Sequence, residues 1–267
     1  MAILTLGRKL GSGSQEIAQA VAKALSYDYV DKKRLFGAMK AAGDRWEGLG
    51  NIFDERLPGV IERNDSSFIG FIALIEYIVL QFALKDNVTI AGRGSNFVLK
   101  DVPYALRIRV VAPLEQRIER VMRREDVSRE IAEMLIKKAD HEMARTVHYI
   151  YGKDWDDPAQ YDAIVDTGAE TMSQIVESLT KQLILKDALR TEEAKKQLAL
   201  KAKAYEIRAG LLTNPKLPMP VLDMRIEGGG LVLRGVAMNT DVAERVEEVA
   251  RRIARDTPLR IDIYSYR

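Results

Sequence analysis

Residues 3–18 read ILTLGRKLGSGSQEIA, in which an apolar strand passes into a helix through a turn that holds two glycines. Gly11 and Gly13 let the backbone bend so that consecutive N–H groups converge on one point. The N-terminus of the following helix adds partial positive charge there. The stretch therefore predicts a polyphosphate-binding loop, whose binding residues are Gly11, Ser12, Gly13, Ser14, Gln15 and Glu16.

The loop lacks the lysine of the full phosphate-binding pattern G-x-x-x-x-G-K-[ST]. With Gly13 as the second glycine, Arg8 stands at the first glycine, Ser14 at the lysine and Gln15 at the hydroxyl residue. A strand-to-helix turn with two glycines also occurs in doubly wound domains that bind no nucleotide. That alternative stays open on the loop alone.

A second strand-to-helix turn strengthens the phosphate interpretation. Residues 88–99 read VTIAGRGSNFVL, so that Arg93 stands between two glycines directly after an apolar strand. A guanidinium group at the carboxyl end of a strand can grip a phosphate with two parallel hydrogen bonds.

Five blocks of sequence, in order between about residue 2 and about residue 182, resemble the cytidylate kinase-like family, a branch of the nucleoside monophosphate kinases. The blocks are RKLGSGSQEIA (8–18), YVDK (29–32), GRG (92–94), VAPLEQR (111–117) and YGKDW (151–155) before Tyr161 and Asp162. The resemblance implies an α/β fold of the P-loop kinase type, a parallel sheet with helices on both faces. It also implies ATP and Mg²⁺ as cofactors and a small-molecule acceptor as the partner.

The resemblance assigns roles to several charged residues. It places the monophosphate acceptor at Asp31 and Arg93, and more weakly at Arg34, although Asp31 could equally cap the next helix. The expected catalytic cations are Arg8, Lys9, Arg124 and Arg145. The arginines at 117, 120, 123 and 124 lie at helical spacings and are either lid cations or a solvated face with intrahelical ion pairs.

Two departures from the family pattern leave the activity open. Gln15 stands where the family places a loop arginine, and Met143 stands where it places an arginine three residues after Asp140. Arg145 follows two residues later. One hypothesis is therefore a kinase in which Arg8 or Lys9 supplies the missing charge. The other is a non-catalytic nucleotide sensor that signals through the last third of the chain.

Composition excludes several classes of site. The 267 residues include 41 basic and 39 acidic side chains, a net charge of +2, which gives no concentrated basic surface for a nucleic acid. The sequence has no cysteine, which excludes disulfides, thiolate metal sites and cysteine nucleophiles. It has two histidines, which exclude a histidine-rich metal site, so we predict no metal-ligating side-chain cluster.

The most apolar run, Phe68 to Leu84, is slightly short for a membrane span and carries Glu76 near its middle. It is expected to be a buried helix packed on the sheet. The opening residues are too short for the apolar core of a secretion signal and are used as a strand. We therefore expect a cytoplasmic protein.

Strand and helix patterns alternate through the first two thirds of the chain, which predicts a parallel sheet covered on both faces. The resemblance implies that residues 1–186 form a cytidylate kinase-like P-loop domain. Residues 32–67, which hold Trp46, are expected to form an inserted cap over the acceptor site. Ser128 favours a new helix start, and a strand over Ala163–Asp166 followed by a helix from Ser173 closes the domain.

The last third has a different pattern. A charged helix over Thr191–Arg208 ends at Gly210, and a connection with three prolines leads to alternating runs at 221–226, 231–236 and 259–264. A helix capped by Asn239 or Thr240 separates the last two runs. The order α-β-β-α-β resembles a BON domain, which implies ligand binding without catalysis. The predicted boundaries are a helix and proline-marked connection over 187–220 and a BON-like domain over 221–267. The helix 191–208 could also belong to the BON-like domain. This C-terminal domain could form homo-oligomers.

Overall fold

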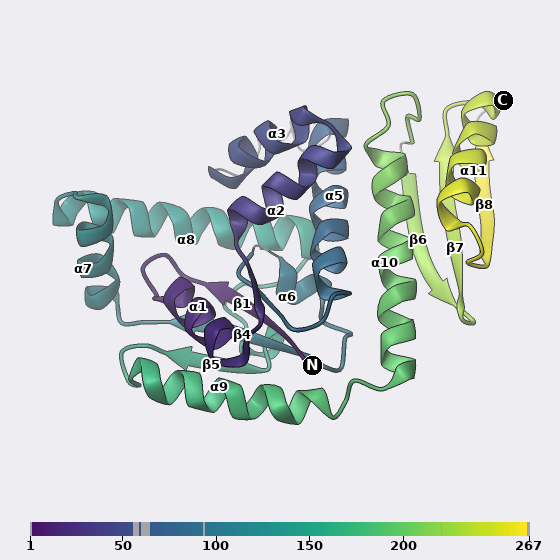
Figure 1. Cartoon of the computed structure of the whole chain (residues 1–267). Helices are drawn as coiled ribbons and strands as arrows, with labels where there is room; N and C mark the ends of the chain where they lie inside the picture. Colours follow the sequence, from purple (N-terminus) through teal and green to yellow (C-terminus); the bar gives the residue numbers. More distant parts are fainter. Residues whose placement is uncertain (1, 56–58, 60–64, 93, 220, 266–267) are drawn as a thin grey trace. The chain divides into compact units, whose positions relative to one another are not determined.

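The computed structural model describes residues 2–55, 59, 65–92, 94–219 and 221–265. Within these ranges the chain forms two compact units, each with its own sheet (Figure 1). The first unit is built mainly from residues 2–35 and 85–194, and the second mainly from residues 36–53, 65–84 and 195–265. The units therefore interleave in sequence, while the predicted domain boundary at residue 186 stays a prediction.

The first unit contains a parallel sheet of five strands in the order β2-β3-β1-β4-β5, as the alternating pattern predicts. The strands are β1 (Ile3–Arg8), β2 (Asp28–Val30), β3 (Val88–Ile90), β4 (Ala105–Val111) and β5 (Ala163–Asp166). Ile3 pairs with Val88 on one side and with Ala105 on the other. Strand β1 is therefore central, which explains why its side chains are apolar on both faces.

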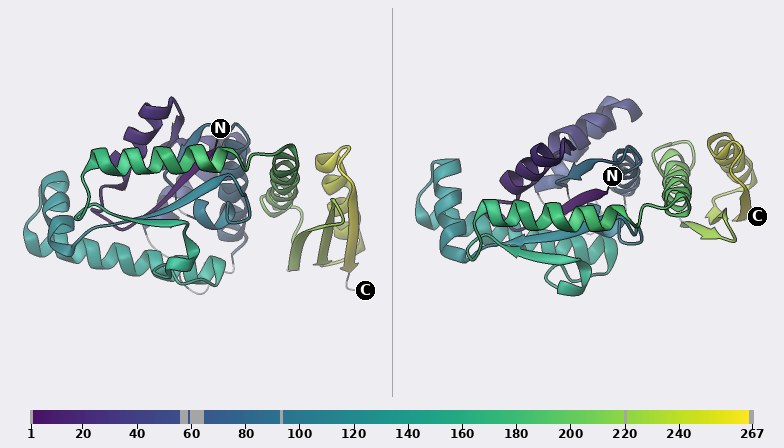
Figure 2. Two further views of the ribbon diagram at one scale, coloured as in Figure 1. Left: turned by 90° about the horizontal axis from the view of Figure 1, so that it is seen from below. Right: turned by 60° about the horizontal axis from the view of Figure 1, so that its bottom comes forward.

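One face of the sheet is covered by helices α1 (Ser14–Leu25) and α9 (Met172–Asp187). Leu4 and Leu6 of β1 point to this face and join a core with Ile17 and other buried residues of both helices. Figure 2 shows α9 lying along the sheet.

Side chains that alternate with these two leucines point to the opposite face. Thr5 shares a hydrogen bond with Ser95 at the start of the short helix α6 (Ser95–Val98). Gly7 lies against the ring of Tyr161, which is 3.0 Å from where a Cβ atom of the glycine would be. The structure thus confirms a parallel sheet with cover on both faces.

Two helices follow β4, with the break that the sequence predicts. They are α7 (Leu114–Glu125) and α8 (Arg129–Tyr151). The hydroxyl of Ser128 accepts a hydrogen bond from the backbone N–H of Ile131 and so caps α8.

The segment expected to form the cap contains helices α2 (Lys32–Met39) and α3 (Asp44–Glu55), joined by a 3-10 turn over Lys40–Ala42. Residues 56–58 and 60–64 of this expected cap lie outside the described residues. Trp46 of α3 is fully buried and lies against Gly70, whose missing side chain leaves room for the indole ring.

Helix α5 (Ser66–Ala83) is, among the described residues, the one helix long and apolar enough to cross a membrane by length and composition. It is 61% buried inside the protein, which confirms a buried helix, while its packing on the five-stranded sheet stays a prediction. Glu76 at its middle is 6% exposed and pairs with Arg208 of helix α10 (Glu192–Leu212). Helix α5 and α10 from Lys195 onward belong to the second unit.

The last third has the predicted order α10-β6-β7-α11-β8. Its other elements are β6 (Val221–Glu227), β7 (Gly230–Ala237), α11 (Thr240–Ala254) and β8 (Leu259–Ser265). Strand β7 is central, antiparallel to β6 and parallel to β8. Gly228 and Gly229 form the tight turn with φ angles of 59° and 78°, and Asn239 caps α11 through the N–H of Val242. Apolar side chains of α10 and α11 form one core with the sheet.

One predicted boundary is wrong. Gly210 does not end the charged helix, because α10 continues to Leu212. A Cβ atom on Gly210 would lie 2.5 Å from Cδ1 of Ile253, so the glycine serves the close approach of α11. A packing requirement, not helix termination, explains this residue.

Candidate functional site

The loop that joins β1 to α1 has the backbone geometry that the sequence predicts. Gly11 and Gly13 have φ angles of 76° and 80°, which residues with side chains rarely adopt. A Cβ atom on Gly11 would lie 2.7 Å from the carbonyl oxygen of Arg117, so this position has no room for one. Helix α1 begins directly after Gly13, and the first N–H groups of a helix have no acceptor inside it.

The loop borders a cavity of about 460 Å³, a size typical of small-molecule sites. Residues of β1, the loop, α7 and the turn after β5 line it. The charged lining residues are Arg8, Lys9, Glu16, Arg120, Arg123 and Arg124. Five basic side chains against one acidic side chain favour an anionic ligand.

The cavity brings together most of the predicted cofactor and catalytic residues. All six loop residues from Gly11 to Glu16 line it, together with Arg8, Lys9 and Arg124. Arg145, the fourth predicted catalytic cation, is absent from this lining, and its guanidinium group pairs with Glu142 on its own helix at 3.3 Å. The catalytic roles themselves stay predictions.

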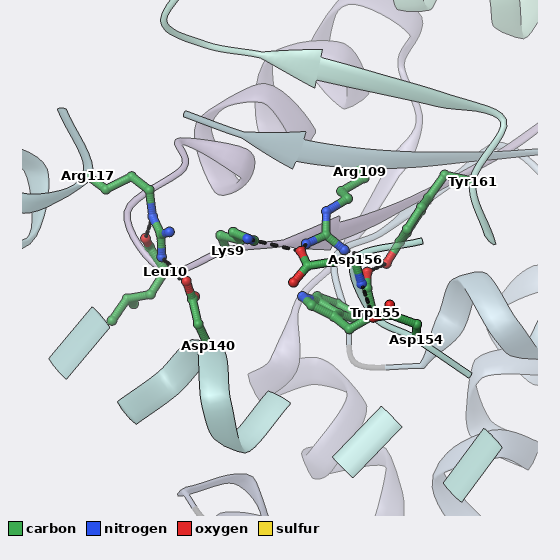
Figure 3. A network of polar contacts seen from close by, with 9 residues as sticks. All are labelled: Lys9, Leu10, Arg109, Arg117, Asp140, Asp154, Trp155, Asp156 and Tyr161. Atoms are coloured by element: carbon green, nitrogen blue, oxygen red, sulfur yellow. Dashed lines mark hydrogen bonds and ion pairs between the residues drawn. The ribbon is translucent and has the colours of Figure 1, made fainter. Parts of the chain in front are cut away.

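Lys9 belongs to a charged network beside the loop (Figure 3). Its Nζ lies 2.9 Å from Asp156 Oδ1, and the same carboxylate accepts a hydrogen bond from Arg109. Arg109 is 2% exposed and donates to the hydroxyl of Tyr161 at 3.1 Å, with its guanidinium group near the ring of Trp155. Asp156 therefore holds Lys9 at the rim of the cavity and compensates part of its charge.

Burial also raises the pKa of Tyr161, against the opposing effect of the Arg109 charge. The phenol therefore stays neutral at physiological pH and donates its proton to the carbonyl oxygen of Trp155 at 3.0 Å. This bond fixes the turn that carries Asp156.

Ser12 gives an independent sign that the loop binds a ligand. It is 1% exposed, and its hydroxyl has no hydrogen-bond partner among the residues that the structure describes. An unpaired buried hydroxyl is unfavourable by roughly 1–3 kcal/mol. A phosphate oxygen at the loop would give it an acceptor, so the cradle and its donors fit a polyphosphate.

The predicted acceptor residues lie at the carboxyl end of β2 and after β3. Asp31 accepts a hydrogen bond from the backbone N–H of Arg34 at 2.9 Å and so caps α2, the structural role that the sequence left open. The guanidinium group of Arg34 pairs with Asp28, and this hydrogen bond holds the pKa of the Asp28 carboxyl below its usual value. Arg93 lies outside the described residues. Acceptor binding by these three residues stays a prediction.

The sequence predictions missed Arg109, Asp156 and Thr167. Arg109 interrupts a buried strand, and an arginine in such a strand is a signal that it has a buried partner. Asp156 directly follows the YGKDW block. Thr167 lies in the turn after β5, and no local pattern in the sequence brings it to the loop.

Comparison with known proteins gives three results. The sequence model of the family described as "Cytidylate kinase-like family" matches residues 3–169. The cytidylate kinase of Pyrococcus abyssi is 29% identical over 169 residues, which cover 62% of this chain and 84% of that protein. The cytidylate kinase of Methanocaldococcus jannaschii is 28% identical over 170 residues, which cover 62% of this chain and 88% of that protein. An uncharacterized protein of Eubacterium ventriosum shares the fold, with a TM-score of 0.54 at 19% identity over 68% of this chain and 98% of that one.

Proposed function

Because the chain belongs to the cytidylate kinase-like family, we propose that it transfers a phosphoryl group from ATP, with Mg²⁺, to a nucleoside monophosphate or a similar small acceptor. The observation that carries this proposal is the basic cavity around the glycine loop, whose volume, five basic lining residues and left-handed glycines support polyphosphate binding. Family membership alone would leave the site unspecified.

The nucleoside triphosphate would lie along the loop, with the N–H groups of Gly13 and Ser14 directed at its phosphates. Mg²⁺ prefers oxygen ligands and keeps several waters, and in such sites the phosphates themselves supply much of its coordination. Bound there, the ion would neutralise charge on the transferred group.

Catalysis would consist of positioning and charge neutralisation, without a covalent intermediate. Arg8 and Arg124 are two of the five basic residues that line the cavity and would replace the missing loop charge, Arg124 by giving up part of its contact with Glu125. Lys9 could join them only by giving up part of its contact with Asp156. Asp31, Arg34 and Arg93 would hold the acceptor, as the resemblance implies.

A second candidate function is a non-catalytic nucleotide sensor. Gln15 and Met143 favour it, and so does the position of α10 within the second unit. One face of α10 packs in the core of the three-stranded sheet through Ile207, while Arg208 pairs with Glu76 of α5. A change at the small sheet would therefore reach α5, whose Gly70 lies against Trp46 of the expected cap.

The small domain itself would bind a ligand or a second copy of the chain, as its likeness to a BON domain implies. Its element order supports this proposal, and its ligand is not specified by any described residue. Because the cytidylate kinases that this chain resembles act on soluble nucleotides, we propose that the protein works in the cytoplasm.

The two functions are separated by an assay of ADP release with ATP, Mg²⁺ and a panel of nucleoside monophosphates, run beside calorimetric nucleotide binding. Turnover that depends on one monophosphate supports the kinase. Binding of ATP without turnover by any acceptor supports the sensor. Failure of the wild-type chain to bind ATP contradicts both.

A further inference from the structure

Three consecutive carbonyl oxygens of the phosphate loop accept hydrogen bonds from side chains outside it. These bonds run from Arg117 Nε to Leu10 at 2.7 Å, from Arg120 Nη1 to Gly11 at 3.2 Å and from Thr167 Oγ1 to Ser12 at 2.9 Å. We call the three donor side chains the carbonyl bracket. Arg117 and Arg120 come from α7 and Thr167 from the turn after β5, so two separate elements grip the loop backbone.

The bracket determines where the loop N–H groups point. In a trans peptide the carbonyl group and the next N–H group point in opposite directions, and the described chain has no cis peptide bond. Fixing the carbonyls of Leu10 and Ser12 therefore fixes the N–H groups of Gly11 and Gly13. The N–H between them, on Ser12, is used within the loop and donates to the Lys9 carbonyl at 3.1 Å.

Arg117 is the most buried member of the bracket, at 5% exposure. Both oxygens of Asp140 accept hydrogen bonds from its Nη2 at 2.8 Å, and Figure 3 shows the guanidinium group between Leu10 and Asp140. Asp140 lies on α8, so the loop is connected through Arg117 to the helix that follows α7. The guanidinium group thus donates from Nε to the loop and from Nη2 to Asp140, a two-directional contact that a lysine cannot reproduce.

We propose that Arg117, Asp140 and Thr167 are positioning residues that hold the loop N–H groups in the orientation that binds polyphosphate. This inference rests on the proposed function, since it concerns the same loop. Gln15 brings no charge to the loop, so phosphate affinity depends more strongly on the aim of the backbone donors. Arg117 and Asp140 are absent from the cavity lining, and they act through the Leu10 carbonyl.

A purely structural role would have a different signature. It would lower the unfolding temperature and leave the affinity of the folded protein for phosphate unchanged. Positioning predicts that affinity falls even at a temperature where the variant is fully folded, because small misplacement of a binding group has a large effect.

The test uses the full-length chain and two probes, inorganic tripolyphosphate and ATP, with binding measured by calorimetry well below the unfolding temperature. Arg117→Lys keeps the charge beside Asp140 and loses the two-directional contact. We expect its tripolyphosphate affinity to fall about tenfold or more. Arg129→Ala removes an exposed arginine that pairs with Glu115 on the neighbouring helix and should leave the affinity unchanged.

Substitutions at Thr167 test the same proposal without removing a buried charge. Thr167→Val loses the hydroxyl that donates to Ser12 and accepts from Arg120 Nη1, whereas Thr167→Ser keeps it. We expect the valine variant to bind tripolyphosphate roughly three- to tenfold more weakly and the serine variant to restore most of the affinity.

Folded Arg117→Lys and Thr167→Val variants with wild-type tripolyphosphate affinity would overturn the positioning role, even if ATP turnover had established the kinase. Tripolyphosphate binding that is weakened in both variants, together with no ATP binding by the wild type, would support positioning and contradict the nucleotide function. Wild-type protein that binds neither probe would overturn both.

Discussion

The phosphate loop region has buried arginines beside it, whereas the three-stranded sheet has exposed arginines. Beside the loop, Arg109 and Arg117 are buried and donate to carboxylates and to backbone oxygen. On the small sheet, arginines are exposed and pair with acidic residues of the same sheet: Arg225 with Asp223, Arg234 with Asp262, and Arg260 with Glu227. Exposed pairs of this kind contribute about 0–1 kcal/mol each, whereas buried charges are costly unless they are fully paired.

This difference indicates where the chemistry lies. Every buried polar or charged side chain in the part of the chain that the structure describes lies before residue 161, and most of them belong to the first unit. After residue 194 the described interior is apolar. The buried arginines Arg109 and Arg117 of the first unit contact residues beside the phosphate loop, and burial of charge is typical of a functional site.

The largest effect is expected at the loop. Gly13→Val should abolish nucleotide binding, because φ is 80° at this position and a side chain would occupy the space in front of Arg120. Calorimetry with ATP and Mg²⁺ measures the loss, and Gly48→Ala is the control, since nothing lies within 4 Å of a Cβ atom there. Wild-type affinity in folded Gly13→Val would remove the loop from the site.

A large effect on stability is expected in the second unit. Arg208→Ala leaves the buried carboxylate of Glu76 without this partner, which should lower the free energy of unfolding by roughly 3 kcal/mol. Urea denaturation measures it, with Arg252→Ala as an exposed control that should change little. If the two units are energetically separable, ATP affinity stays within a few-fold of wild type. Equal destabilisation by both variants would contradict the buried-pair account.

A smaller gain is expected from restoring charge to the loop. Gln15→Arg should strengthen ATP binding about fivefold, because an exposed cation beside a phosphate contributes on the order of 1 kcal/mol. Gln182→Arg, at a half-buried position of α9, controls for the added charge alone. An unchanged affinity in Gln15→Arg would indicate that Arg8 or Arg124 already supplies the charge.

The smallest effect concerns acid stability of the first unit. Burial raises the pKa of Asp162, but hydrogen bonds from Arg107 and the charge of Lys186 bring it below its ordinary value of 3.8. The pair therefore stabilises the fold above about pH 4, and this contribution is lost as the pH falls through the lowered pKa. Urea midpoints of wild type and Asp162→Asn should differ at pH 7 and converge as the pH falls through the lowered pKa of Asp162. A constant difference would show that ionisation of Asp162 is not responsible.

Local signals in the sequence predicted much of this fold. The apolar run of β1, the caps at Ser128 and Asn239 and the glycine turn of the hairpin each act over a few residues, and the structure has all of them. Gly210 was misjudged because its purpose is a contact with Ile253, 43 residues away.

For the site too, the sequence predicted the local features and missed the long-range contacts. The loop residues follow from one short stretch, but the bonds from Arg117 and Thr167 to that loop are long-range. Asp31 shows a different limit, because a helix cap and an acceptor ligand require the same carboxylate at the same position.

The most direct test of the central claim is hydrogen exchange of the full-length chain with and without ATP and Mg²⁺, which locates nucleotide binding whether or not turnover occurs. The account predicts slower exchange on binding at residues 9–16 and along α7 near residues 120–124, with little change over β6, β7 and β8. Protection confined to the three-stranded sheet, with none at the loop, would contradict it.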